Sequence, residues 1–146
     1  MNILILNGPN INMLGKREPE LYGQRGYDAL VAGIEQYCQK KDVRVSFFQS
    51  NHEGALIDRI QEGCGEVDGI VFNPAAYTHT SVALLDAIKA VAIPTVEVHL
   101  TDISSREDFR QISYIRQACI ATISGHGFEG YLEAIDLLLK HLKKPL

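Results

Sequence analysis

The hydrophobic positions of the chain form short apolar runs that alternate with segments of helical periodicity. The first run, from Ile3 to Leu6, is entirely apolar, which is typical of a parallel strand that is buried on both faces. Further strands are expected over residues 43–49, 68–72, 94–100 and 120–123, where β-branched and aromatic residues gather. The pattern therefore predicts a sheet of five short strands.

Segments with apolar residues at helical spacing separate these strands. The inward-facing positions expected are Tyr27, Leu30, Val31, Ile34, Tyr37 and Cys38 in the first helix; Leu56, Ile57, Ile60 and Cys64 in the second; Val82, Leu85 and Ile88 in a third that begins near Thr78; and Tyr131, Ile135, Leu138, Leu139 and Leu142 in the last. The S-x-x-E sequence from Ser50 to Glu53 predicts a capping box at the start of the second helix. Strand and helix thus alternate throughout.

This alternation implies a parallel sheet that is covered on both faces and connected by right-handed crossovers. A length of 146 residues with 46% hydrophobic content fits one domain, over residues 1–146, with a sizeable core. The size is that of a flavodoxin-like, three-layer α/β fold, for which the expected strand order is 2-1-3-4-5. The ligand site of such a fold lies at the carboxyl ends of the strands, where the first and third strands diverge.

Composition argues against several kinds of partner. The 14 basic and 18 acidic residues give a net charge of −4 without a basic tract that could follow a phosphate backbone, so no nucleic-acid partner is expected. Three widely spaced cysteines without a C-x-x-C motif indicate reduced thiols and no structural metal site. Because the chain shows neither a basic signal region nor an apolar run of about 18 residues, we expect a cytoplasmic protein without a membrane span.

Two glycine motifs resemble nucleotide-binding loops only weakly. The stretch from Gly8 to Lys16 has the wrong glycine spacing for a Walker loop, and Arg17 stands where a magnesium-binding hydroxyl is needed. The stretch from Gly125 to Gly130 fits G-x-G-x-x-G, but no further strand follows it to supply the ribose-binding acid. Its glycines are expected to permit a tight turn and close helix packing.

A long polar loop after the first strand carries Asn10, Arg17 and Tyr22. Loops beyond about 12 residues are usually functional, although a mobile surface connection is the alternative. Tyr22 could act as a base only as a phenolate, and lowering its pKa by about three units requires roughly 4 kcal/mol from several cations in a water-excluded pocket. Arg17, Arg106 and Arg110 are the candidate cations, the last two expected on one face of a helical turn. An ordinary packed aromatic is the alternative for Tyr22.

The expected topology brings the ends of the third and fourth strands to this loop, and with them Asn73, His79 and His99. Glu97 lies on the same side of its strand as His99 and could orient the ring of a general acid, although a core histidine is the alternative. His79, at a helix start, could bind ligand oxygens or cap the helix. Asn73 could bind a carboxylate or hydroxyl, or only fix the following turn. Asp86 would be a solvated residue unless it meets another subunit.

Four stretches together resemble the type II 3-dehydroquinate dehydratases: NGPNINMLGKREPELYG from Asn7, NPAAYTHTSVALLDAI from Asn73, EVHL from Glu97 and REDFR from Arg106. The resemblance spans essentially the whole chain. It implies a flavodoxin-like fold and a homo-dodecamer built as a tetramer of trimers. It also implies a hydro-lyase without a cofactor that converts 3-dehydroquinate to 3-dehydroshikimate in the shikimate pathway, although some relatives act in quinate breakdown.

The resemblance implies roles for individual residues. Tyr22 would remove a proton from carbon 2 of the substrate to give an enolate, and His99 would protonate the hydroxyl that leaves carbon 1 on the opposite face. Arg17 would stabilise the transition state and the Tyr22 phenolate, with Arg106 nearby, while Asn10 would position a water at the enolate. The substrate-binding residues would be Asn73, His79, Asp86, Leu100, Thr101 and Arg110, with Asp86 reaching the site of a neighbouring subunit.

One position departs from the family pattern. Asp102 follows Thr101, where the family commonly has Asn. A carboxylate beside the carboxylate of the substrate would repel it, so we expect Asp102 to turn away from the site. A large gain in substrate affinity from Asp102→Asn would contradict this expectation.

Two other functions compete with dehydration through an enolate. A non-catalytic flavodoxin-like ligand-binding module would need neither a phenolate nor a proton donor, so Tyr22 together with His99 distinguishes the two hypotheses. Schiff-base dehydration would use Lys16 or Lys89, and both are expected on solvated surfaces. That chemistry is therefore disfavoured.

Overall fold

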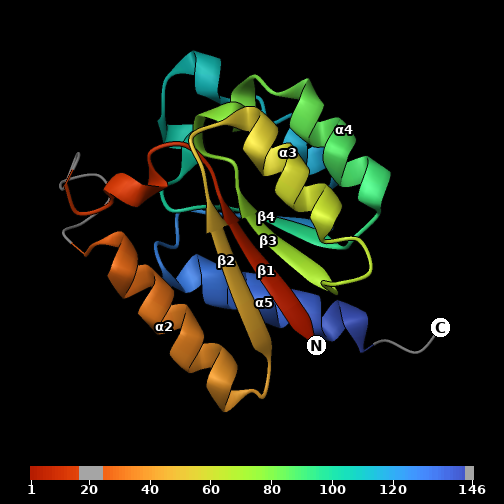
Figure 1. Cartoon of the computed structure of the whole chain (residues 1–146). Helices are drawn as coiled ribbons and strands as arrows, with labels where there is room; N and C mark the ends of the chain where they lie inside the picture. The colour runs from red at the N-terminus through yellow and green to blue at the C-terminus, as the bar shows by residue number, and fades with distance from the viewer. Residues whose placement is uncertain (17–24, 144–146) are drawn as a thin grey trace.

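The computed structural model describes residues 1–16 and 25–143, whose arrangement is shown in Figure 1. One sheet of five parallel strands has the order β2-β1-β3-β4-β5. The strands are β1 (Asn2–Asn7), β2 (Arg44–Gln49), β3 (Gly69–Asn73), β4 (Thr95–His99) and β5 (Ala121–Ser124). The predicted fold class and strand order are confirmed.

Helices cover both faces of this sheet. The α-helices in the described part of the chain are α2 (Tyr27–Lys40), α3 (Glu53–Glu62), α4 (Val82–Val91) and α5 (Glu129–Leu142). Helices α2 and α5 lie on one face and α3 and α4 on the other, which gives three layers (Figure 1). None of these helices has the length and hydropathy needed to cross a bilayer.

The apolar run of β1 is buried on both sides because successive side chains of a strand point in opposite directions. Ile3 and Ile5 pack in the hydrophobic cluster beneath α2 and α5, whereas Leu4 and Leu6 pack beneath α3 and α4. All four residues are 0% exposed. This two-sided burial explains why the strand is continuously apolar rather than alternating.

The glycine motif between β5 and α5 serves packing, as predicted. Gly125 and Gly127 have positive φ angles of 85° and 59°, which lets the chain turn sharply into α5. A Cβ added at Gly130 would lie 3.3 Å from Cγ2 of Ile123, so glycine allows the helix to approach the strand closely.

The start of α3 differs from the prediction. The helix begins at Glu53, and its N-cap is His52, which makes no side-chain capping hydrogen bond. Ser50 lies too early in the chain to cap, and its Oγ instead accepts a hydrogen bond of 3.0 Å from the backbone N–H of His52. No capping box forms. Cys64, predicted to face inward, lies beyond the last residue of α3 and is exposed.

The segment after β3 also differs, because it forms two helices rather than one that begins near Thr78. A 3₁₀ helix, η2 (Ala75–His79), is followed by α4, whose N-cap Ser81 accepts a hydrogen bond of 2.9 Å from the N–H of Leu84. Val82 was predicted to face inward but is 52% exposed, since it precedes the buried stripe of α4. Leu85 and Ile88 are buried as predicted.

After β4 the chain folds into short 3₁₀ turns before it reaches β5. These turns are η3 (Ile103–Ser105), η4 (Asp108–Arg110) and η5 (Ile115–Ala118). Ile115 is fully buried in the cluster beneath α3 and α4 and anchors η5 to the sheet. The segment is therefore held against the carboxyl end of β4.

Candidate active site

A pocket opens at the carboxyl ends of β1, β3 and β4, the edge of the sheet at which a ligand was expected. Its walls come from the loop after β1, from the end of β3 with η2, and from the segment after β4. The predicted site residues that line it are Asn10, Asn73, His79, His99, Leu100, Thr101, Arg106 and Arg110. The topology thus brings together residues from three distant parts of the sequence.

The other predicted site residues do not line this pocket. Glu97 lies directly behind His99 and is fully buried. Asp86 is exposed on α4, away from the pocket of its own chain. Arg17 and Tyr22 lie outside the described residues.

His99 and Glu97 form a buried ion pair at the end of β4. Nε2 of His99 lies 2.7 Å from Oε2 of Glu97, and the two side chains are 6% and 0% exposed. A carboxylate accepts hydrogen bonds, so Nε2 donates and Nδ1 is the ring nitrogen left for the pocket. Glu97 and His99 are therefore in contact, as their shared side of the strand predicted.

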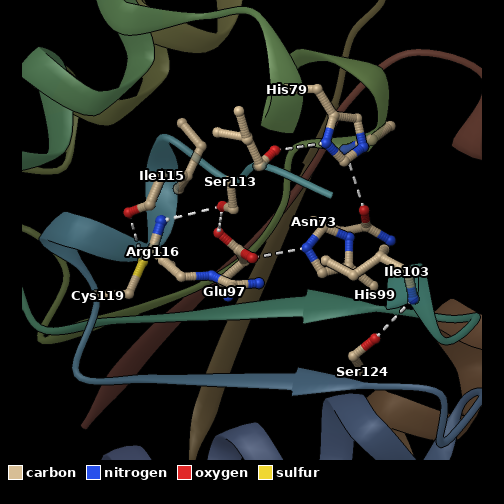
Figure 2. A network of polar contacts seen from close by, with 12 residues as sticks. Asn73, His79, Glu97, His99, Ile103, Ser113, Ile115, Arg116, Cys119 and Ser124 are labelled. Atoms are coloured by element: carbon tan, nitrogen blue, oxygen red, sulfur yellow. Dashed lines mark hydrogen bonds and ion pairs between the residues drawn. The ribbon is translucent and has the colours of Figure 1, made fainter. Parts of the chain in front are cut away.

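The second oxygen of Glu97 is bound by Ser113, a residue that the sequence analysis did not identify. Ser113 Oγ donates to Oε1 of Glu97 at 2.6 Å and accepts from the backbone N–H of Arg116 at 3.2 Å (Figure 2). Ser113 itself is 6% exposed. No local spacing in the sequence connects it to a strand residue.

Asn73 is held by a buried tyrosine beneath the pocket. It pairs in register with Asn7 of the neighbouring strand β1. Tyr131, from α5, donates its hydroxyl to Oδ1 of Asn7 at 2.7 Å and accepts from Nδ2 of Asn73 at 2.9 Å. Oδ1 of Asn73 accepts from the N–H of Ala75 at 3.1 Å, so the side chain also fixes the turn after β3. One N–H of the Asn73 amide remains for a ligand.

Tyr131 is a second residue whose part in the site was not foreseen, although it was expected on the inward face of its helix. The side chain is 0% exposed. Burial raises the pKa of Tyr131 above its usual value, so the hydroxyl stays neutral and can donate. Its two hydrogen bonds fix the orientation of both amide groups.

His79 presents a hydrogen-bond acceptor to the pocket. Nδ1 lies 2.7 Å from the carbonyl oxygen of Ile112, and because a carbonyl only accepts, Nδ1 carries the proton (Figure 2). Burial lowers the pKa of His79 below its usual value, which favours the neutral ring with a lone pair on Nε2. That nitrogen can accept from a ligand hydroxyl. Since Ser81 caps α4, the alternative capping role does not apply to His79.

Arg106 and Arg110 make one wall of the pocket cationic. Their side chains are 15% and 28% exposed. Nε of Arg110 lies 2.6 Å from Oε2 of Glu107, and Nη1 of Arg106 donates to Oγ1 of Thr101 at 3.4 Å. The expectation of one shared helical turn is wrong, because Arg106 has extended backbone between η3 and η4. Both guanidinium groups nevertheless face the same pocket.

Leu100 and Thr101, the two residues that follow β4, line the pocket. The carbonyl of Thr101 accepts from Oγ of Ser124 at 3.1 Å, which ties this segment to β5. The side chain of Asp102 points into the turn that follows it, where Oδ1 accepts hydrogen bonds from the N–H and the hydroxyl of Ser104 at 2.9 and 2.6 Å. Its carboxylate is thus used as a cap for η3 and does not line the pocket, as expected.

The loop after β1 reaches the pocket by passing close to the end of β3. The N–H of Gly8 donates to the carbonyl of Asn73 at 2.8 Å, and a Cβ at Gly8 would lie 2.5 Å from the carbonyl oxygen of Pro74. Only glycine therefore allows this approach. The N–H of Asn10, further along, donates to Oδ1 of Asn51 at 3.0 Å.

The described residues do not bring together the groups needed for Schiff-base or metal-ion chemistry at this pocket. Lys16 and Lys89 are exposed and do not line the pocket, as expected. No cluster of His, Cys, Asp and Glu suited to a metal ion occurs within residues 1–16 and 25–143. What the pocket offers is an acid–base pair beside groups that bind anions and hydroxyls.

A flavodoxin-like α/β protein with such a site is a candidate acid–base enzyme, and comparison with known proteins identifies its family. The chain matches the model of dehydroquinase class II over residues 1–139. It is 50% identical over 144 residues to the 3-dehydroquinate dehydratase of Geotalea daltonii, covering 99% of this chain and 100% of the relative. It is 48% identical over 141 residues to that of Clostridium botulinum strain Loch Maree, covering 97% and 96%.

The solved structures agree with this result. The type II dehydroquinase from Butyrivibrio crossotus matches with a TM-score of 0.94 and 49% sequence identity, covering 95% of this chain and 97% of that one. The chain belongs to the class II dehydroquinase family.

Proposed function

We propose that this chain is a type II 3-dehydroquinate dehydratase, a hydro-lyase that forms 3-dehydroshikimate in the shikimate pathway. The observation that carries the proposal is the buried pair of His99 and Glu97, which presents one ring nitrogen to the pocket. A non-catalytic binding module would gain nothing from such an oriented proton donor. Membership in the dehydroquinase family supports the same reaction.

The described lining of the pocket suits an anionic, hydroxylated substrate. Arg106 and Arg110 supply positive charge, the free N–H of Asn73 donates, and Nε2 of His79 accepts from a hydroxyl. Leu100 and Thr101 would bind the substrate carboxylate through backbone N–H and hydroxyl groups. Complementary contacts of this kind would orient 3-dehydroquinate for reaction.

Elimination needs a base and an acid on opposite faces of the substrate. Tyr22, as a phenolate, takes a proton from carbon 2, and the electron pair forms an enolate with the adjacent ketone. When the enolate collapses to the double bond between carbons 1 and 2, His99 protonates the departing hydroxyl, which leaves as water. Arg17 stabilises the transition state, and Asn10 positions a water at the enolate. Neither a cofactor nor a metal takes part.

The proposal extends to the assembly and location of the enzyme. Residues 1–146 form one catalytic domain, and twelve copies assemble as a tetramer of trimers in the cytoplasm. In this arrangement Asp86, which is exposed on α4 and lies away from its own pocket, would contribute to the site of a neighbouring subunit. Sedimentation analysis should give a mass of twelve chains, and a monomer with full activity would contradict the assembly.

Formation of the conjugated product tests the activity directly. Purified, chelator-treated protein is mixed with 3-dehydroquinate, and the enoate absorbance is followed with time beside Tyr22→Phe and His99→Ala. We expect absorbance to rise with the unmodified protein and to rise more slowly by orders of magnitude in both variants. Absence of any rise with folded unmodified protein would refute the dehydratase and favour the binding module.

A further inference from the structure

We infer that Ser113 is a positioning residue that acts through Glu97 to hold His99 with Nδ1 toward the substrate. The inference rests on the proposed dehydratase function and extends it to a residue outside the pocket lining. Ser113 touches neither the pocket nor His99 directly, and its hydroxyl reaches the site through the Glu97 carboxylate.

The backbone N–H of Arg116 fixes the direction of the hydrogen bonds that connect Ser113, Glu97 and His99. The backbone N–H of Arg116 can only donate, so Ser113 Oγ accepts there at 3.2 Å. The hydroxyl hydrogen of Ser113 is then directed to Oε1 of Glu97 at 2.6 Å. Oε2 of the same carboxylate faces Nε2 of His99 at 2.7 Å (Figure 2). Glu97 accepts on both oxygens, which leaves Nε2 as the donor.

Ser113 is well suited to hold a carboxylate because its own position is fixed. It lies two residues before η5, which Ile115 anchors in the core with 0% exposure. Glu97 is also 0% exposed, so water does not replace the serine as a donor. Without the hydroxyl, the carboxylate would lose a charge-assisted hydrogen bond and the restraint on its rotation.

The consequence for the reaction is the choice of ring nitrogen. If Nε2 keeps its hydrogen on Glu97, His99 enters the step as an imidazolium with a second hydrogen on Nδ1, and that is the proton it transfers to the departing hydroxyl. Water leaves, and the ring becomes neutral with its remaining hydrogen on Nε2. A carboxylate that is free to rotate would let the ring turn, and Nδ1 would spend less time aimed at the hydroxyl.

The test compares two variants that each lose one buried hydroxyl on the same side of the sheet. Ser113→Ala should lower kcat about 10- to 100-fold, the range expected for a buried hydrogen bond to a charged group, with KM changed less than about threefold. Thr95→Val is the matched control, since Thr95 lies on β4 on the side of Glu97, is fully buried and donates only to the carbonyl of Ile93, at 2.9 Å. Its kcat should stay within about twofold.

A second comparison separates positioning from general loss of structure. In a His99→Ala background, Ser113→Ala should cause no further loss of kcat, because the group it positions is absent. The inference is overturned if Ser113→Ala retains its kcat, if Thr95→Val loses as much, or if the two losses are additive.

Neutron diffraction from the unmodified protein decides the matter even if Ser113→Ala does not fold. Deuterium on Ser113 Oγ directed at Glu97, with deuterium on Nε2 of His99, is the expected result. Deuterium on Oε1 of Glu97, or a Ser113 hydroxyl directed elsewhere, would overturn the inference. Failure of the unmodified protein to convert 3-dehydroquinate would instead refute the proposed function, and the neutron result would still decide the role of Ser113.

Discussion

Polar side chains occur at both ends of the sheet, but among the described residues the charged and amide side chains are buried only at the carboxyl end. Asn73 and Glu97 at that end are 3% and 0% exposed, and each is held by hydrogen bonds from a distant segment. At the amino end, the carboxylate of Asp68 accepts from the N–H of Asn2 at 2.7 Å on an exposed surface. Burial of a polar group costs free energy unless its hydrogen bonds are satisfied.

This difference separates a functional edge from an ordinary surface. An open groove at the amino end is lined by Arg44 and Arg59, whose charges remain in contact with solvent. At the carboxyl end, the half-buried Arg106 and Arg110 face a pocket with a preorganised histidine. Electrostatic interactions are stronger where water is excluded, so the carboxyl edge is where charge can be used for catalysis.

The largest effect should come from Glu97→Gln. An amide has one acceptor oxygen and one NH₂ group, so it cannot accept from both Ser113 and His99. We expect kcat to fall about 10³- to 10⁴-fold, since neutralising the carboxylate behind a catalytic histidine costs about 10⁴-fold in serine proteases. Steady-state rates, with circular dichroism to confirm folding, measure this loss. Turnover within about threefold of the unmodified protein would contradict it.

A smaller loss is expected from Tyr131→Phe, which removes the buried hydroxyl between Asn7 and Asn73. The free energy of unfolding should fall by about 1–3 kcal/mol because two buried polar groups lose their partner. KM should rise severalfold as Asn73 becomes less ordered. Tyr37→Phe is the control, since that hydroxyl bonds to Asp136 at the surface and its removal should cost less than about 1 kcal/mol.

Urea unfolding curves of both tyrosine variants measure these energies. Equal losses in the two variants would show that burial at the carboxyl edge adds nothing to the strength of the hydrogen bonds.

A pH-dependent contribution to stability should come from His79, whose pKa in the folded protein is lowered by burial. Above the unfolded pKa of about 6.5, the ring is neutral in both states and this contribution is fully present. As the pH falls below that value, the unfolded chain binds the proton more readily, so stability is lost. The comparison is between urea midpoints of the unmodified protein and His79→Gln at about pH 7.5 and 5.5.

The unmodified protein should lose more stability than His79→Gln over this interval. A difference between the two proteins that does not change with pH would contradict the assignment of a lowered pKa to His79.

The smallest effect is expected at the amino end of the sheet. Asp68→Ala removes the acceptor for the N–H of Asn2, but water can replace an exposed partner. The free energy of unfolding should fall by less than about 1 kcal/mol, and kcat should not change. Thermal unfolding and the rate assay measure both quantities. A loss of activity from Asp68→Ala would contradict the division between the two edges.

Much of the fold could be predicted because it depends on periodicities that are local in the sequence. The continuous apolar run at Ile3 to Leu6 predicted a buried strand, and the alternation of strands with helices predicted that the sheet is parallel. The ends of helices depend on tertiary packing, which the sequence pattern does not contain. That is why Ser50 failed as a cap and Val82 failed as a core residue.

The site was predictable to the extent that parallel strands bring their carboxyl ends together. His99 and Glu97 share one side of a single strand, so their contact followed from local geometry. Ser113 and Tyr131 contact the site across 16 and 58 residues, distances at which only the folded structure determines neighbours. Tyr131 was expected to be buried, but the partners of its hydroxyl depend on how α5 crosses beneath β3.

The most direct test of the account is the initial rate of enoate formation from 3-dehydroquinate by the unmodified protein, His99→Ala and Asp68→Ala. We predict similar rates for the unmodified protein and Asp68→Ala, and a rate lower by orders of magnitude for His99→Ala. Equal rates in His99→Ala and the unmodified protein, or no product from any of the folded proteins, would contradict the claim that the buried carboxyl edge is the catalytic edge.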